Sequence, residues 1–81
     1  METVTLDELK TVFSENVKAR RNELGLSQSE LARQTRIDQA NISGFESGSR
    51  LPSLESLTRL AAGLNIAPDV LLRAKVFSKS A

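Results

Sequence analysis

The chain has 81 residues, of which 40% are hydrophobic and 26% charged, and it contains neither cysteine nor histidine. This length supports one small domain with one core. The lack of cysteine and histidine excludes disulfides, thiolate and imidazole metal ligands, and nucleophile–histidine catalytic pairs. We therefore expect a single domain spanning residues 1–81, with no metal, no cofactor, no evident small-molecule ligand and no enzyme activity.

The net charge is only +1, but the charges are unevenly distributed. Residues 1–15 contain four acids and one base, whereas residues 16–81 contain six acids and ten bases. An ordinary solvated surface would explain this asymmetry as well as a nucleic-acid partner would. No apolar run reaches the roughly 20 residues that span a bilayer, and the acidic start is unlike a signal peptide. We expect a cytoplasmic protein with no membrane partner.

Helix signals follow one another along the chain, and the period-2 runs typical of strands are missing. Thr5 and Glu8 have the spacing of a capping box, which predicts a first helix starting there. Gly25 is a suitable residue to close it. The stripe predicted to face inward is Leu9, Phe13, Val17, Arg21 and Leu24.

Two short helices are predicted next. Ser27 and Glu30 form a second capping box, opening a helix of about two turns that stops near Thr35. Asp38 is a good N-cap for a third helix, which Gly48 would end.

The junction between these two helices is the most informative part of the sequence. Only Arg36 and Ile37 separate the end of one from the N-cap of the next, so the two helices must meet steeply. A steep pair joined by a short turn is the helix-turn-helix geometry. The residues expected to point inward are Leu31, Ala32, Thr35, Ile37, Ile42 and Phe45.

Two further helices complete the prediction. Pro52 and Ser53 precede a helix over residues 54–62, with Gly63 at its C-terminal cap and a buried stripe of Leu54, Leu57, Leu60, Ala61 and Leu64. Pro68 opens a fifth helix that reaches about Ala74. The expected fold is therefore an all-α, five-helix domain over residues 5–74, with a short basic tail at 75–81.

The third helix has an outward face free of large apolar side chains, formed by Gln39, Ala40, Ser43, Gly44 and Ser47. A helix fits the major groove, and amide side chains pair bidentately with adenine, so Gln39 is the leading base reader. Ala40 could contact a thymine methyl, and Asn41 a base or a phosphate. Gly44 would allow a close approach to DNA. The alternative is a polar, solvated face.

Several short motifs along residues 17–72 carry a family resemblance. They are Arg20-Arg21, Leu24-Gly25-Leu26-Ser27-Gln28, Glu30-Leu31-Ala32, Ile42-Ser43-Gly44-Phe45-Glu46, Pro52-Ser53-Leu54 and Leu60-Ala61. Together they resemble the phage repressor and Cro-like (XRE) helix-turn-helix family of DNA-binding regulators, whose fold is lambda-repressor-like. Ile42-Ser43-Gly44 with Glu46 and Ser49-Arg50 is similar, more narrowly, to restriction-modification controller proteins. A phage switch, a restriction-modification controller and an antitoxin all stay open, as do the operator and the sign of regulation.

The resemblance implies roles for individual residues. Phosphate contacts are expected from Ser27, Gln28, Ser47 and Arg50. Apart from the resemblance, Arg33 and Arg36 are candidates for additional phosphate contacts, with simple solvation as the alternative. Base contacts are expected from Gln39, Ala40, Asn41 and Ser43. Phosphate contacts set the register and base contacts choose the sequence.

Arg21 lies on the apolar stripe of the first helix, where a lone guanidinium would be costly, so it requires a carboxylate. The resemblance implies that Glu46 is that partner. Two positions depart from the family. Arg36 replaces a glycine of the turn and would be strained by roughly 1 kcal/mol if left-handed. Ala67 replaces a capping serine or threonine, so the fifth helix is expected to start raggedly.

One short recognition helix reads too few base pairs for useful selectivity. A homodimer on a near-palindromic operator doubles the site. The apolar residues expected at its interface are Ile66, Val70, Leu71 and Phe77. Alternatively, Val76 and Phe77 fold back over the core. The alternative function is a helix-turn-helix module that acts mainly through protein–protein contact, such as the antitoxin half of a toxin–antitoxin pair.

Overall fold

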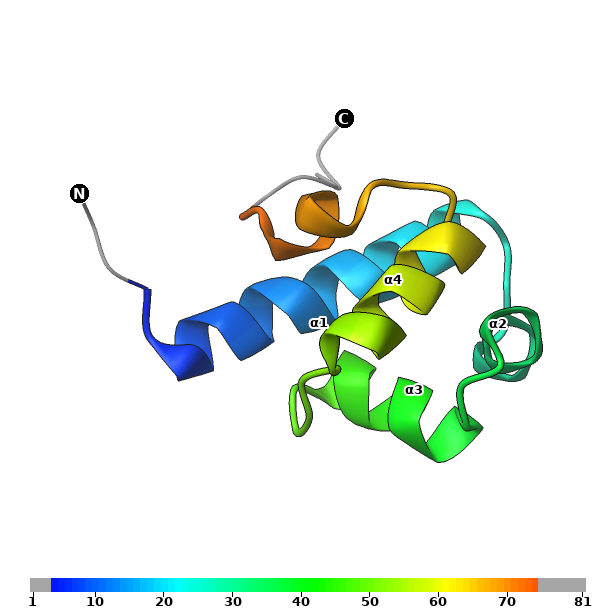
Figure 1. Cartoon of the computed structure of the whole chain (residues 1–81), viewed down its shortest axis with the longest axis horizontal. Helices are drawn as coiled ribbons and strands as arrows, with labels where there is room; N and C mark the ends of the chain where they lie inside the picture. Colours follow the sequence, from blue (N-terminus) through cyan, green and yellow to red (C-terminus); the bar gives the residue numbers. More distant parts are fainter. Residues whose placement is uncertain (1–3, 75–81) are drawn as a thin grey trace.

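Helical segments account for most of residues 4–74, the part of the chain that the computed structural model describes. They are four α-helices and one 3-10 helix: α1 (Leu6–Glu23), α2 (Gln28–Thr35), α3 (Gln39–Ser47), α4 (Leu54–Gly63) and η1 (Pro68–Leu72). α1 runs along the molecule and packs against α3 and η1, while α4 packs against α2 and η1 (Figure 1). Within this range, no helix is both long and apolar enough to cross a membrane. The all-α class is confirmed.

α1 begins where the sequence predicted. Thr5 Oγ1 accepts the backbone N–H of Glu8 at 3.1 Å, and Thr5 N–H donates to Glu8 Oε1 at 2.9 Å, which completes a capping box. These bonds satisfy helix N–H groups that would otherwise have no partner. The helix ends at Glu23, and Gly25 follows in the left-handed region with φ +70°. Leu24, expected to face inward, is 39% exposed because it lies beyond the last helical turn.

α2 and α3 meet steeply, as a helix-turn-helix requires. In Figure 1, α2 is viewed almost along its axis, whereas α3 lies across the view. The Ser27–Glu30 capping box is present at the start of α2. Arg36 adopts a left-handed conformation (φ 59°, ψ 36°) and turns the chain toward α3. Asp38 is the N-cap of α3, but its side chain makes no capping hydrogen bond.

The core lies between the helices, and all five helical elements contribute residues to it. Phe13 of α1 and Phe45 of α3 meet edge to face, with ring centroids 5.7 Å apart at 71°, a favourable aromatic geometry. The residues predicted to point inward from α2 and α3 are buried, except that Ala32 is half-buried against the core. The buried hydrophobic residues are Phe13, Val17, Leu31, Ile37, Ile42, Phe45, Leu57, Leu60, Ala61, Leu64 and Leu71.

Two predictions about α4 are wrong. Leu54 was expected in the core but is 83% exposed. It is the first residue of the helix, and helical side chains tilt toward the N-terminus, so it points beyond the helix end. Gly63 is not the left-handed residue; Asn65 is, with φ 58°. Gly63 instead lies against α2, where an added Cβ would come within 2.5 Å of Thr35 Cγ2.

The fifth element is a five-residue 3-10 helix, not the α-helix that the sequence predicted. Ala67 supplies no side-chain cap, as expected from its lack of a hydroxyl group. The buried amide of Asn16 in α1 donates to the carbonyl oxygens of Leu71 at 3.0 Å and Arg73 at 2.6 Å. Carbonyl groups at a helix end have no partner within the helix, and Asn16 supplies donors to them. The C-terminal end of η1 is therefore anchored to α1.

Candidate nucleic-acid interface

The outward face of α3 is a row of small and polar side chains. Its exposed members are Gln39, Ala40, Ser43 and Ser47, while Asn41 is half-buried on the flank. The opposite side of the helix is fixed in the core by Ile42 and Phe45. All four predicted base-contacting residues, Gln39, Ala40, Asn41 and Ser43, thus lie on one short helix. A slim polar helix face has the width and the hydrogen-bonding groups suited to a major groove.

Gly44 is not on this exposed face, contrary to the sequence prediction. It is buried beneath the side chain of Arg50, and a Cβ at position 44 would lie 2.9 Å from Arg50 Cδ. The absence of a side chain at Gly44 therefore makes room for the stem of Arg50. The Arg50 guanidinium donates from Nη1 to Asn41 Oδ1.

An ion pair with α1 holds the other side of α3. The expected ion pair between Arg21 and Glu46 is present: Arg21 Nε lies 2.6 Å from Glu46 Oε2 and Nη2 lies 3.0 Å from Oε1. The hydrogen bonds with Glu46 raise the pKa of Arg21 above its ordinary value. Arg21 Nη1 also donates to the carbonyl of Leu26 at 2.7 Å, and Gln28 Nε2 donates to Glu46 Oε1 at 3.2 Å. These contacts join α1 and α2 to α3.

At the N-terminus of α2, some backbone N–H groups are hydrogen-bonded and others are free. Ser27 Oγ is used as the helix cap, accepting from Glu30 N–H at 3.0 Å. The backbone N–H groups of Gln28 and Ser29 have no acceptor among residues 4–74. Free N–H groups at a helix N-terminus favour anions. Ser27 and Gln28 therefore border an anion-accepting end, although their own side chains already have partners within the chain.

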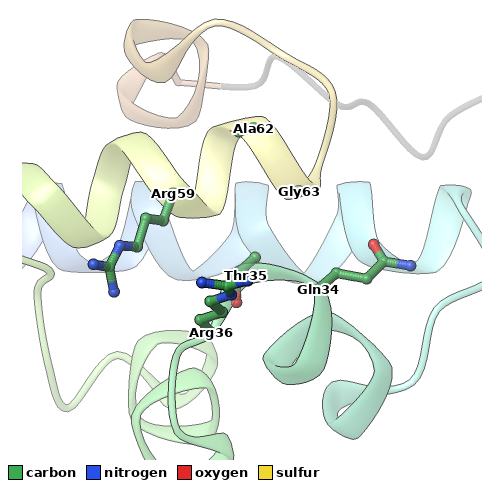
Figure 2. A pocket seen from close by; sticks show the side chains of 6 residues that line it. All are labelled: Gln34, Thr35, Arg36, Arg59, Ala62 and Gly63. Atoms are coloured by element: carbon green, nitrogen blue, oxygen red, sulfur yellow. The ribbon is translucent and has the colours of Figure 1, made fainter.

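Arg33 and Arg36 are exposed, and neither side chain is hydrogen-bonded or ion-paired to another described residue. Arg36 borders an open groove of about 430 Å³ between α2 and α4, which is lined by Gln34, Thr35, Arg36, Arg59, Ala62 and Gly63. Figure 2 shows Gln34 pointing away from Arg36 and Arg59. Arg33 lies in the last turn of α2 and Arg36 is its C-cap, so both complement the negative C-terminal end of that helix.

The predicted dimer-interface residues have different environments. Leu71 is fully buried in the core of one chain, so its side chain is unavailable to a partner and the prediction for it is corrected. It is buried because η1 closes the core against α1 and α4. Ile66 and Val70 are half-buried. Phe77 and Val76 lie outside the described residues.

Two polar residues of α1 make structural contacts that were not predicted from the sequence. Asn16 holds η1, and Arg20 Nε donates to the carbonyl of Leu64 at 2.9 Å, which caps the end of α4. Both lie on the side of α1 that carries Phe13 and Val17, at spacings of three or four residues. A polar residue within an apolar helical stripe was the available sign that it has a specific partner.

Comparison with known proteins identifies helix-turn-helix proteins as relatives of this chain. A helix-turn-helix family model, HTH_3, matches residues 17–71. The chain is similar to the crystal structure of the hypothetical transcription factor NHTF from Neisseria, with 31% identity over 91% of this chain and 85% of that one, and a TM-score of 0.79. It is also similar to the restriction-modification controller protein C.AhdI from Aeromonas hydrophila, with 34% identity over 76% of this chain and 94% of that one, and a TM-score of 0.74.

A third similar structure is the DNA-binding domain of the P22 C2 repressor, with 27% identity over 100% of this chain and 96% of that one, and a TM-score of 0.74. The comparison with curated proteins gave no match. The family model covers more than half of the chain, and its matched residues include α2, the Arg36 turn and α3. The chain belongs to the XRE-type helix-turn-helix family of DNA-binding transcription regulators.

Proposed function

We propose that the chain is a sequence-specific double-stranded DNA-binding regulator that inserts α3 into the major groove of a near-palindromic operator as a homodimer. The observation that carries this is the exposed row on α3, held rigidly by Arg21 and Glu46 from behind. Similarity to a transcription factor, a controller protein and a repressor domain supports it. Gln39, the first residue of α3, is the leading base reader, because the N-terminal residues of a recognition helix contact base edges.

Phosphate contacts would flank the base-reading row. The free N–H groups of Gln28 and Ser29 at the start of α2 would donate to one phosphate. Ser47 follows on the other flank, while Arg33 and Arg36 are exposed donors on the α2 side. Such contacts fix the register of the protein on the duplex without reading sequence.

The homodimer would form near η1, through the partly exposed Ile66 and Val70 together with Phe77. A two-fold dimer of this kind places recognition helices about 34 Å apart on the DNA. We further propose that residues 1–81 form one domain and that the protein acts in the cytoplasm, where its DNA target would be.

The test is selection of bound duplexes from a random-sequence pool at fixed salt, followed by affinity measurement at several salt concentrations. We expect a near-palindromic site and a log–log salt slope near 0.9 in magnitude per neutralised phosphate. Gln39→Ala should relax one position in each half-site, with a loss of discrimination of about 1–3 kcal/mol.

Uniform weakening by Gln39→Ala over all sequences would assign Gln39 to the DNA backbone. If no duplex is enriched, the proposed function fails, and the same fold acting through protein contact becomes the better account. Ultracentrifugation at tens of micromolar checks the dimer, which a purely monomeric chain would contradict.

A further inference from the structure

Arg50 is drawn back along α3 by contacts with Gly44. The carbonyl oxygen of Gly44 accepts the backbone N–H groups of Ser49 at 3.0 Å and Arg50 at 3.2 Å, which ties the α3–α4 loop to the helix. Ser47 Oγ donates to the same carbonyl at 3.1 Å. The stem of Arg50 then crosses Gly44 so closely that an added Cβ would be 2.9 Å from Cδ, 3.0 Å from Cγ and 3.4 Å from Nε.

This path carries the guanidinium from the loop after α3 to Asn41, the third residue of the helix. Arg50 Nη1 donates to Asn41 Oδ1. An arginine has only donors, so the amide of Asn41 must turn its oxygen toward Arg50. The Nδ2 group of Asn41 and the remaining guanidinium nitrogens of Arg50 have no acceptor in the described part of the chain. Together the two side chains offer several free donors on the flank of the exposed row, and their one acceptor, Asn41 Oδ1, already accepts from Arg50.

The excess of free donors decides which base edge would fit. An asparagine with a free amide reads adenine by accepting from N6 and donating to N7. Asn41 Oδ1 already accepts from the Arg50 guanidinium, so adenine N6 would have to share that oxygen and lie beside a cationic donor. Guanine presents two acceptors, O6 and N7, in the major groove. The location also matters, because the N-terminal part of a recognition helix is the part that contacts base edges.

We propose that Asn41 and Arg50 act as one unit that reads a guanine, with Gly44 as the residue that positions Arg50. Arg50 is then a specificity-determining residue and not the phosphate contact that the sequence suggested. The inference rests on the proposed function, since it needs the row on α3 to face the major groove.

The test uses the full chain, a random-sequence duplex pool at fixed salt, and three variants: Arg50→Ala, Asn41→Ala and Gly44→Ala. The wild type should require a guanine at one position of each half-site. Arg50→Ala should reduce the preference for that guanine by roughly 5- to 150-fold, the range of one lost base contact. Because Arg50→Ala also frees the Asn41 amide oxygen, adenine should become acceptable at the same position.

Gly44→Ala is the most specific test of the positioning role, because it removes no hydrogen-bonding side chain. The new Cβ displaces the flexible stem of Arg50, so the guanine preference should fall at the same position as in Arg50→Ala. Alanine favours a helix over glycine, so loss of folding does not explain such a result. Arg33→Ala is the matched control, since it removes an exposed arginine that has no contact with Asn41.

The outcomes separate the two proposals. A wild-type chain that enriches no duplex overturns both the function and this inference. A wild-type chain that selects a site, with Arg50→Ala weakening all sequences equally as Arg33→Ala does, leaves the function standing and overturns the inference. A guanine preference unchanged in Gly44→Ala overturns the positioning role of Gly44.

Discussion

Arg21 of α1 and Glu46 of α3 form a two-pronged ion pair in which the Arg21 side chain is 13% exposed and the Glu46 side chain only 4%. Gln28 of α2 donates to the same carboxylate. One carboxylate therefore connects α1 and α2 to α3, which carries the proposed DNA-facing row. Its effect is to fix the angle of α3 relative to α2 as well as to neutralise a poorly solvated guanidinium.

Glu46→Gln should lower the free energy of unfolding by about 1–3 kcal/mol, because it leaves Arg21 without a counter-charge while keeping the side-chain shape. Urea unfolding measures the change. DNA affinity should fall together with stability, because α3 loses the ion pair that fixes its orientation. The control is Glu23→Gln, which removes an exposed ion pair with Arg20 and should cost less than about 1 kcal/mol. Equal effects of the two variants would contradict a special role for Glu46.

The same glycine-to-alanine change should have opposite effects at two helical positions. At Gly63 the new Cβ would lie 2.5 Å from Thr35 Cγ2, so α2 and α4 must separate, at a cost of about 1–3 kcal/mol. At Gly44 the nearest atoms belong to the flexible stem of Arg50, and the higher helix propensity of alanine should stabilise the fold by up to about 1 kcal/mol. Thermal unfolding of the two variants side by side checks the signs. Stabilisation by Gly63→Ala would show that the helices do not approach so closely.

Arg36→Gly should raise the free energy of unfolding by up to about 1 kcal/mol, because glycine relieves the left-handed strain at φ 59°. Asn65→Gly is the matched comparison: Asn65 has φ 58°, but asparagine tolerates this region, so little or no gain is expected. Chemical denaturation of both variants measures the difference. If Arg36 contacts phosphate, Arg36→Gly also weakens binding to all duplexes alike. A loss of stability in Arg36→Gly greater than in Asn65→Gly would argue that the arginine side chain stabilises the turn.

The two capping boxes make stability depend on acid pH. Hydrogen bonds from Thr5, chiefly its backbone N–H, lower the pKa of Glu8, and those from Ser27 lower the pKa of Glu30 in the same way. A carboxyl whose pKa is lower in the folded chain binds fewer protons there than in the unfolded chain. Its stabilising effect is therefore complete above the ordinary glutamate pKa of about 4.3 and is lost as the pH falls through the lowered folded value.

The measurement is the urea midpoint as a function of pH for the wild type and for a double variant, Glu8→Gln with Glu30→Gln. Glutamine can occupy a capping box but carries no titrating group. The double variant should lose less stability on acidification than the wild type. Parallel curves would mean that the boxes do not contribute to acid sensitivity.

Local sequence determined most of the helix starts and the turn of the recognition unit. Capping boxes involve residues three apart, so Thr5–Glu8 and Ser27–Glu30 could be recognised without a structure, and both are present. The two-residue spacing at Arg36 and Ile37 likewise left only a steep crossing. The exposed row on α3 followed from helical periodicity, because the apolar residues Ile42 and Phe45 must face the core.

Tertiary contacts decided what local rules could not. Asn16 donates to the carbonyl of Leu71 in η1 and to that of Arg73 just after it from more than fifty residues away, and local spacing gives no sign of these bonds. Gly63 looked like a helix terminator, but the approach of Thr35 from another helix is what its lack of a side chain accommodates.

Arg50 and Gly44 were both assigned to DNA from the sequence, whereas the fold packs one on the other and links Arg50 to Asn41. The physical reason is common to these cases. Backbone hydrogen bonding and capping act within a few residues, so residue spacing in the sequence predicts them. Side-chain packing depends on which distant segments the fold brings into contact.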